Sequence, residues 1–382
     1  MDALLRQEEK EMVELFRQFA EKEVRPISAK YDEKGEFPAE VFAKAAEIGL
    51  TTLHLPEKYG GSGCSHLMQA MLIEELARAD AGFATAVGAC DLASVPVLIA
   101  GTEEQKKKVA DVLLWGGLTA FCLTEPEAGS DAASLKTTAV KDGDEYVING
   151  SKCFITNGGV ADIYTVFATV DRSLGAKGIT AFLVERGTPG LSVGKEENKM
   201  GIRLSNTTEV VFEDVRVPAS NIIGQVGKGF GIAMKTLDIT RGSDGGAGAV
   251  GICQCAIDLA VEYAKTRKTF GKPIIANQAI QFKLADMEIK TQAARNLVYH
   301  ACRLMDAGIM DSVISAAAKA YAGDVAVEVA LEAIQIFGGY GYSREYPVEK
   351  LLRDAKIFQI FEGTGEVQRM VIAAGLAKNI IK

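Results

Sequence analysis

The stretch FCLTEPEAGSD, residues 121–131, stands where the pattern of the sequence changes. Before it, apolar residues recur every three or four positions, as Leu15, Phe16 and Phe19 do, which indicates amphipathic helices. After it come short runs rich in β-branched and aromatic residues, separated by turn sequences such as KDGDE and NGSK. We therefore predict an N-terminal helical domain over residues 1–117 and an antiparallel, barrel-like β domain over residues 118–226.

The helical spacing returns after the β domain. It runs through long segments near 229–266, 277–306, 310–336 and 363–380, which short loops containing glycine join. Long helices joined in this way are typical of a bundle. Residues 227–382 are therefore predicted to form a C-terminal four-helix bundle, and the fold class is α+β.

Charge and composition exclude several classes of function. Of the 382 residues, 42 are Lys or Arg and 50 are Asp or Glu, which gives a net charge of −8. Binding of nucleic acid through a broad basic surface is not expected of such a protein, although a local basic pocket is compatible with it. The three histidines are scattered, so neither a metal site nor a histidine-based triad is expected. The 39 glycines indicate tight turns or backbone that approaches a ligand closely.

The cysteines and the apolar stretches favour a cytoplasmic protein. The cysteine count of seven is odd and no C-x-x-C pair occurs, which favours buried free thiols in a reducing compartment. The amphipathic start MDALLRQEEKEMVELF does not have the pattern of a signal peptide. Asp91 and Pro96 interrupt the most apolar stretch, residues 82–100, so no membrane span is expected.

Residues 242–251, GSDGGAGAVG, contain the spacing G-x-G-x-x-G at Gly246, Gly248 and Gly251. A dinucleotide-binding fingerprint follows a strand, whereas a helical pattern both precedes and follows this segment. We therefore interpret these glycines as close helix packing or as an irregularity within a helix.

Three segments carry unusual chemistry. Residues 121–131 combine the hydroxyl group of Thr124 with acidic residues in a turn-forming stretch. In QIFGGYGYSREYPVEKLLRD, residues 335–354, three glycines interrupt a helical pattern. The segment IFEGTG places Glu362 beside Phe361, where burial would raise the pKa of the carboxyl group. Each segment taken alone also fits a structural role, such as a stabilised loop or a helix corner.

Taken together, the segments resemble the motifs of the acyl-CoA dehydrogenases, flavoproteins that oxidise the α,β bond of an acyl-CoA thioester. The matching motifs, in chain order, are LTEPEAGSD from residue 123, FITNGG from 154, RKTFGK from 267, Q-x-x-G-G-x-G-Y from 335 and FEGT from 361. The resemblance covers nearly the whole chain and includes the helix–sheet–helix order. It implies FAD as the cofactor.

The resemblance also implies a role for each matched position. The residues implied to bind FAD are Phe121, Leu123, Thr124, Gly129, Ser130, Phe154, Thr156, Arg267, Thr269, Phe270, Gln278, Gln335, Gly338, Gly339, Thr364 and Glu366. Those implied to hold the acyl-CoA are Ser130, Asp238, Arg241, Phe361 and Gly363.

Glu362 is the catalytic base that the resemblance implies. It would remove the α proton while the β hydrogen leaves as hydride to flavin N5. Some branches of the family carry the base on an earlier helix, at the position that Thr240 occupies here. Because Thr240 cannot act as such a base, the role falls to Glu362.

Asp91 departs from the family pattern, because a small or hydroxyl residue is usual at this position on the helix that lines the acyl pocket. In one interpretation, Asp91 accepts hydrogen bonds and has no catalytic part. In the other, it is a second catalytic carboxylate, which costs several kcal/mol to bury unless it is paired. A cyclic acyl group of the cyclohexane- or cyclohexene-carboxyl type could use it, including as the base of a 1,4-elimination on a cyclic enoyl-CoA. A short-chain acyl-CoA is the other substrate considered.

The resemblance further implies an acyl-CoA substrate and an electron-transferring flavoprotein as partner. Because a neighbouring subunit completes the FAD site in the family, a homotetramer built as a dimer of dimers is expected. Two alternatives stay open at this point, an oxidase that uses oxygen and a flavin-free acyl-CoA-binding protein of the same fold.

Overall fold

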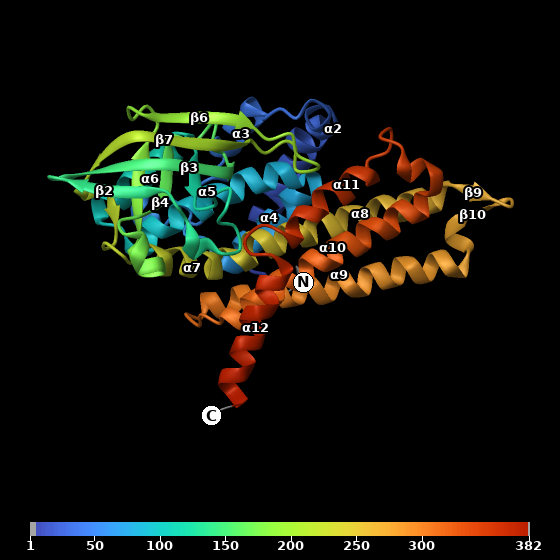
Figure 1. Ribbon diagram of the computed structural model, residues 1–382. Coiled ribbons are helices and arrows are strands. Elements are labelled where there is room, and N and C mark those ends of the chain that lie inside the picture. Colours follow the sequence, from blue (N-terminus) through green and yellow to red (C-terminus); the bar gives the residue numbers. More distant parts are fainter. Residues whose placement is uncertain (1–4, 381–382) are drawn as a thin grey trace.

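The computed structural model describes residues 5–380, and its first part is helical, as predicted (Figure 1). Its helices are α1 (Gln7–Phe19), the π-helical turn η2 (Ala20–Val24), α2 (Arg25–Lys34), α3 (Ala39–Glu47), the short η3 (Glu57–Tyr59), α4 (His66–Ala79), α5 (Ala81–Ala100) and α6 (Glu103–Leu114). Helix α5 is buried along most of its length. It begins at Asp80, whose carboxylate caps it by accepting a hydrogen bond from the amide of Phe83.

The middle part is an eight-stranded sheet in the order β6-β7-β3-β2-β4-β5-β8, with β1 beside β4. The strands are β1 (Thr119–Cys122), β2 (Thr138–Asp142), β3 (Glu145–Thr156), β4 (Ile163–Thr169), β5 (Ile179–Glu185), β6 (Leu191–Glu196), β7 (Thr207–Pro218) and β8 (Ile222–Ile223). Strand β4 is buried at every position, because helices and the rest of the sheet cover both of its faces.

The expectation of a purely antiparallel sheet is wrong. Strand β1 pairs with β4 in parallel, and so does β2 at one position. The reason lies in the β2–β3 hairpin, which reverses the chain once before β4 reverses it again. Strands β1, β2 and β4 therefore run in the same direction, and the sheet is mixed.

Long helices make up the rest of the chain. They are α7 (Gly229–Thr240), the π-helical turn η7 (Arg241–Gly246), α8 (Ala247–Thr266), α9 (Gln278–Asp306), α10 (Ser312–Phe337), α11 (Val348–Ala355) and α12 (Gly365–Ile380). Helices α8, α9 and α10 pack side by side, and α12 projects away from them (Figure 1). A hairpin of β9 (Lys268–Thr269) and β10 (Lys272–Pro273) joins α8 to α9 and was not predicted.

The glycine spacing on α8 serves helix packing, as predicted. A Cβ atom at Gly248 would lie 2.7 Å from Cε1 of Phe358, and one at Gly251 would lie 2.4 Å from the carbonyl oxygen of Glu74. A Cβ atom at Gly246 would lie 2.7 Å from a methyl group of Val298. The irregularity that was the other part of the interpretation is present too, because η7 inserts a π-helical turn just before α8.

Buried thiols and apolar helices form much of the core. All seven cysteines are free and six are buried, as predicted. Two helical segments, Ala81–Ala100 and Gly229–Thr266, are long and apolar enough to cross a membrane, but 72% and 67% of their most apolar windows are buried inside the protein. Both segments are therefore core helices of this fold.

A buried ion cluster ties the last part of the chain to the first two. Lys350 on α11 lies 2.9 Å from Asp80, the residue that caps α5, and pairs with Asp354 one turn further along α11. Asp354 also accepts a hydrogen bond of 2.6 Å from the amide of Ile202. All three charged side chains are buried. The start of α5, the loop before β7 and α11 are thereby fixed relative to one another.

Candidate functional site

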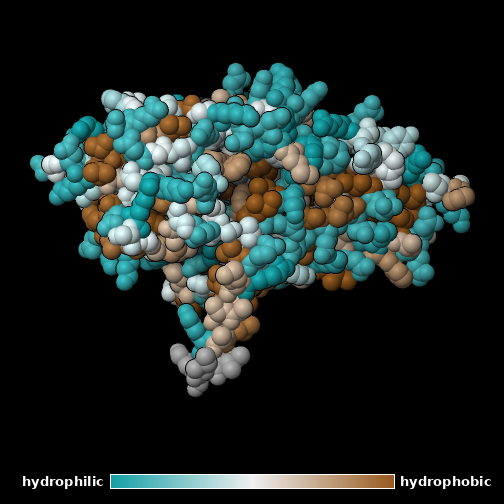
Figure 2. Space-filling view, viewed as in Figure 1, coloured by the Kyte–Doolittle hydropathy of each residue, from teal (hydrophilic) through white to brown (hydrophobic). Residues whose placement is uncertain are grey.

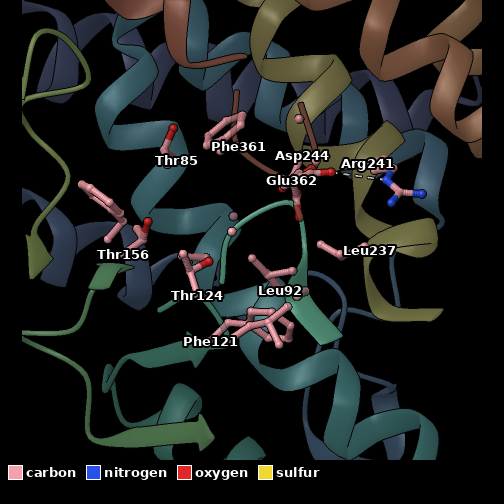
Figure 3. Close-up of a pocket in the computed structure, with 18 of the residues that line it drawn as sticks. Thr85, Leu92, Phe121, Thr124, Thr156, Leu237, Arg241, Asp244, Phe361 and Glu362 are labelled. Carbon is pink, nitrogen blue, oxygen red and sulfur yellow. Dashed lines mark hydrogen bonds between the residues drawn. The ribbon is translucent and has the colours of Figure 1, made fainter. Parts of the chain in front are cut away.

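A cavity of about 300 Å³ lies where α5, β1, β3, α7, η7 and the loop before α12 meet (Figure 3). Helix α5 contributes a row of small residues, among them Ala84 and Gly88, as expected for the helix that lines an acyl pocket. The predicted site residues among its lining are Phe121, Leu123, Thr124, Gly129, Ser130, Phe154, Thr156, Arg241, Phe361, Glu362 and Gly363. Segments more than two hundred residues apart in the sequence therefore meet in one cavity.

A buried ion pair holds the stretch 121–131 in place. The ammonium group of Lys152 on β3 lies 2.6 Å from the carboxylate of Glu125 and donates a second hydrogen bond to the carbonyl of Leu123. The carbonyl of Thr124 accepts a hydrogen bond from the amide of Cys153. Since β3 is a central strand of the sheet, these contacts fix the Thr124 side of the cavity to a rigid element.

The wall formed by β1 and β3 fits an aromatic cofactor. Phe154 has a left-handed φ of 56° and lies at a register shift in β3, which turns its side chain out of the sheet. Its ring is 64% exposed, an unusual state for an aromatic residue beside an apolar cavity. Phe154, Thr156 and Thr124 therefore offer a flat apolar face with hydroxyl groups at its edge, which suits the flavin ring of FAD.

A second recess lies at the far end of the long helices. Arg267, Thr269, Gly338 and Gly339 line it, and the Arg267 guanidinium lies 5.3 Å from the centre of the Tyr340 ring. A cation beside two glycines suits a phosphate group. Phe270 is fully exposed at the tip of the β9–β10 hairpin. The structure therefore does not bring all predicted FAD residues together, and those that line neither space are Phe270, Gln278, Gln335, Thr364 and Glu366.

Three side chains hold the backbone around Glu362. This residue has a left-handed φ of 54°, which costs a non-glycine residue conformational energy and is typical of functional sites. Its carbonyl accepts hydrogen bonds from Gln368 at 3.0 Å and from Arg241 at 3.4 Å (dashed line in Figure 3). The next carbonyl, of Gly363, accepts hydrogen bonds from Gln368 and from Lys319 at 2.8 Å. The direction of the Glu362 side chain is thus set by its surroundings.

The carboxyl group of Glu362 lies in the wall of the cavity. Its Oε2 atom is shielded from solvent without a hydrogen-bond partner among the described residues, and it packs against Gly245. A Cβ atom at residue 245 would lie 2.6 Å from Oε2, so only glycine leaves room for the carboxyl group. Burial raises the pKa of Glu362 to about 7, although the nearby charges of Lys319 and Arg241 lower it. A carboxyl group with this pKa can both accept and release a proton near neutral pH.

Lys319, on α10, was not among the predicted site residues. Its side chain is 1% exposed, and burial lowers the pKa of its ammonium group to about 8, so the group is mostly charged at pH 7. The ammonium group donates to the Gly363 carbonyl and lies 5.8 Å from the centre of the Phe361 ring. Lys319 therefore both positions the loop that carries Glu362 and favours the ionised form of its carboxyl group.

Replacing this lysine is expected to leave less of the Glu362 carboxyl group ionised at neutral pH. Lys319→Met removes a positive charge from the vicinity of Glu362, which raises the pKa of the carboxyl group and leaves less carboxylate at neutral pH. We expect kcat/KM at pH 7 to fall about fivefold and the acidic limb of its pH profile to move to higher pH by roughly one unit. Lys290→Met, at an exposed ion pair on α9, is the control. A lower but unshifted profile would show that Lys319 acts on the loop alone.

Arg241 and Asp238 lie one turn apart at the end of α7, where they form an ion pair. Arg241 lines the cavity, whereas Asp238 does not and accepts a further hydrogen bond from Ser312. Asp238 therefore contributes to the site through the orientation of Arg241.

Asp91 is buried but is not among the residues that line the cavity. Its Oδ2 atom accepts a hydrogen bond of 3.1 Å from Gln69, and its Oδ1 atom lies 3.4 Å from Nδ1 of His54. Burial lowers the pKa of His54, so this imidazole is neutral at physiological pH. Asp91 thus stands one layer behind the cavity wall, in a polar cluster within the N-terminal helices.

Besides Glu362, the exposed Asp131 lines the cavity, and so does Asp244 on η7, whose carboxyl oxygens are shielded from solvent (Figure 3). Sequence reasoning missed it, because the segment GSDGG was interpreted only as helix packing. A signal was available, since an acidic residue three positions after Arg241 lies on the same face of a helix. Asp244 and Glu362 lie side by side in the cavity wall.

Comparisons with known proteins agree with this geometry. Three family profiles match the chain, the acyl-CoA dehydrogenase N-terminal domain over residues 6–116, the middle domain over 120–215 and the C-terminal domain over 227–377. The chain belongs to the acyl-CoA dehydrogenase family. It is therefore an oxidoreductase that acts on CH–CH donors, and FAD is the cofactor of this family.

Individual relatives of this family match over almost their whole length. A short-chain-specific acyl-CoA dehydrogenase of Megasphaera elsdenii is 49% identical over 99% of this chain and 100% of its own. The solved structure of butyryl-CoA dehydrogenase from the same organism is 49% identical, covers 99% of this chain and 100% of its own, and has a TM-score of 0.96. A chain described with the electron transferring flavoprotein of Acidaminococcus fermentans is 45% identical, covers 98% of this chain and 99% of its own, and has a TM-score of 0.96.

Proposed function

We propose that this acyl-CoA dehydrogenase oxidises a short-chain or alicyclic acyl-CoA and that Glu362 removes the α proton. The observation that carries the proposal is the position of Glu362, a carboxyl group with a pKa of about 7 that shares one cavity with the wall suited to a flavin. When bound, FAD would supply the acceptor for the β hydride. The residues that would hold its ring are Phe121, Leu123, Thr124, Gly129, Ser130, Phe154 and Thr156.

The chain's own residues account for the proton transfer. Glu362 is held with its side chain directed into the cavity by the hydrogen bonds to its carbonyl and to that of Gly363. The apolar neighbours Phe361 and Phe358 exclude water, which strengthens a carboxylate as a base toward a weakly acidic Cα–H bond. Arg241, which lines the cavity and pairs with Asp238, would bind a polar part of the CoA together with Ser130.

A spectrum and a bleaching experiment test this function. The purified protein should show the visible absorption bands of bound flavin, and these should bleach when an acyl-CoA is added without oxygen. A colourless protein that binds acyl-CoA would instead support the flavin-free binding protein, and rapid turnover with oxygen alone would support an oxidase. A panel of butyryl-, cyclohexane-carboxyl- and cyclohexene-carboxyl-CoA ranks the substrates in the same experiment.

The alicyclic substrate and the catalytic role of Asp91 belong together in this proposal. The cavity is otherwise mostly apolar, so a buried acid behind its wall brings no gain for a straight saturated chain. A cyclic enoyl-CoA has an acidified C–H bond, and the buried acid could act as the base that removes this proton in a 1,4-elimination. Because Asp91 lies behind the wall, any such effect would pass through Asp244.

Asp91→Asn separates the two roles of this residue. The amide still fits the hydrogen-bonding cluster but cannot accept a proton. If Asp91 takes part in the reaction, we expect bleaching with cyclohexene-carboxyl-CoA to slow at least about a hundredfold, while bleaching with butyryl-CoA changes much less. If Asp91→Asn is bleached by each of the three substrates at the same rate as the unmodified protein, Asp91 has only a structural role.

Partners and assembly extend the proposal. An electron-transferring flavoprotein is the proposed electron acceptor, supported by the similarity to the Acidaminococcus fermentans chain. A homotetramer built as a dimer of dimers is supported by the apolar surface over the long helices (Figure 2), where Phe282, Ile289 and Leu331 are exposed. It is also supported by Phe270, since a fully exposed aromatic residue on a hairpin suits a site that a second subunit completes. We propose a cytoplasmic location.

A further inference from the structure

Asp244 has no part in the mechanism above, although it lines the same cavity as Glu362. Both of its carboxyl oxygens are shielded from solvent and accept no hydrogen bond from a donor among the described residues. The described part of the chain also contains no ion pair that involves Asp244. A buried carboxylate in this state would cost several kcal/mol, so its charge must be removed or shared.

The backbone of α5 leaves room for this carboxyl group. A Cβ atom at Gly88 would lie 3.2 Å from Cγ of Asp244, so a larger residue would displace the acid. Gly88 stands three residues before Asp91 on α5, which places both on one face of the helix. The carboxyl groups of Asp244 and Asp91 interact there, and Oδ1 of Asp91, like both carboxyl oxygens of Asp244, has no donor among the described residues. Two carboxylates offer only acceptors, so this contact requires that one of the two groups carries a proton.

The surroundings indicate which member of the pair carries it. Asp91 already accepts a hydrogen bond from Gln69, whereas no described residue donates one to Asp244. Burial raises the pKa of Asp244 well above its usual value, and the charges of Asp91 and Glu362 raise it further. Asp244 is therefore the member of the pair that carries the proton.

The charged and titratable groups around the pair come from every element packed against it. They are Asp91 on α5, His54 in the loop after α3, Glu362 in the loop before α12, Lys319 on α10, Cys302 on α9 and Arg241 on η7 itself. His54 is neutral, and burial keeps Cys302 a thiol by raising its pKa. Lys319 and Arg241 lie beside Glu362 and bond to its loop. The pair thus adds one negative charge near Glu362, whose effect on the carboxyl group opposes that of the two cations.

We infer that Asp244 and Asp91 hold one proton between them and that the single negative charge of this pair, acting against Lys319 and Arg241, sets the basicity of Glu362. Asp244 is thereby a positioning residue, since it acts on the reaction through Asp91 and Glu362. The inference rests on the proposed role of Glu362 as the base. It gives the departure from the family pattern at Asp91 a part in the ordinary 1,2-elimination as well.

Three variants and their pH profiles of kcat/KM with butyryl-CoA test the inference. In Asp244→Asn the amide can still donate to the Asp91 carboxylate, so one charge remains and the acidic limb should stay in place. In the double variant Asp91→Asn with Asp244→Asn the charge is gone, and the limb should move to lower pH by about one unit. In Asp91→Asn alone the charge passes to Asp244, and the limb should not move to lower pH. An unmoved limb in the double variant would overturn the inference.

A measurement without turnover keeps the test independent of activity and of the double variant's folding. In a Glu362→Gln background, the infrared spectrum of the flavin-loaded protein at pH 7.5, about three units above the usual carboxyl range, should show the carbonyl band of a protonated carboxylic acid. The band should disappear when Asp244→Asn is added. Its absence before that change would overturn the inference, whereas full activity of Glu362→Gln would overturn only the proposed function.

Discussion

Glu362→Gln is expected to keep FAD bound and to lose at least about two orders of magnitude in the rate of flavin bleaching by acyl-CoA, the usual scale for loss of a general base. The amide has the shape of the carboxyl group, so it fits the space beside Gly245 and leaves the held backbone unchanged. It cannot accept the α proton. The rate should therefore fall through the chemical step, with little change in the affinity for the thioester.

The unmodified protein is expected to show a pH dependence of kcat/KM that follows the ionisation of Glu362. Because the pKa of Glu362 is about 7, the carboxylate form gains population as the pH rises from 6 to 8, and kcat/KM should rise through the same range. Glu328→Gln, at an exposed ion pair on α10, serves as the control and should leave the rate and its pH profile unchanged. Near-normal bleaching by Glu362→Gln would mean that another group takes the proton.

Lys350→Met is expected to lower the free energy of unfolding by about 3–5 kcal/mol, the range for removal of one partner from a buried ion pair. The substitution leaves the carboxylates of Asp80 and Asp354 buried together without their shared cation. Asp80 also caps α5, whose small residues line the acyl cavity, so the loss should reach the active site as weaker binding of the substrate.

Denaturant unfolding of the flavin-loaded protein measures this loss. Lys290→Met is the matched control, because Lys290 pairs with Glu328 on the surface, where such pairs contribute at most about 1 kcal/mol. If Lys350→Met lowers the free energy of unfolding by as little as Lys290→Met, water or backbone groups must stabilise the carboxylates of Asp80 and Asp354.

Much of the fold could be predicted because its signals are local. The helices α9, α10 and α12 lie within a few residues of the predicted segments, since a sustained apolar period decides them. The four-residue strand β1 and the two-residue strands β9 and β10 were missed, because such short runs have no period to detect. The parallel pairing of β1 with β4 depends on the path of the chain between them, which residue patterns do not encode. The domain boundaries at 117/118 and 226/227 stay predictions.

The residues of the candidate site can also be separated into those that the sequence predicts and those that it does not. The motif residues around Glu362 and Thr124 were predicted because each motif is a continuous stretch that resembles a motif of the family. Lys319 and Asp244 were not predicted, because their importance comes from burial beside Glu362 and Asp91, far away in the sequence. An alanine-rich helix with one lysine and a glycine-rich turn with one aspartate are ordinary sequences. Only tertiary contact gives these two residues an electrostatic role.

The π-helical turn η7 also constrains how this site can change. An α-helix rotates by about 100° per residue, so the extra residue of a π-helical turn rotates α8 relative to α7 by about that angle. In the present register, Asp244, Gly245 and Gly248 reach the cavity, while Gly248 also packs against Phe358 and Gly251 faces α4. Deleting one residue from η7 would restore a regular helix but turn one of these two faces away. Single substitutions can therefore tune the acids, whereas insertions and deletions here would disrupt the core and the active site together.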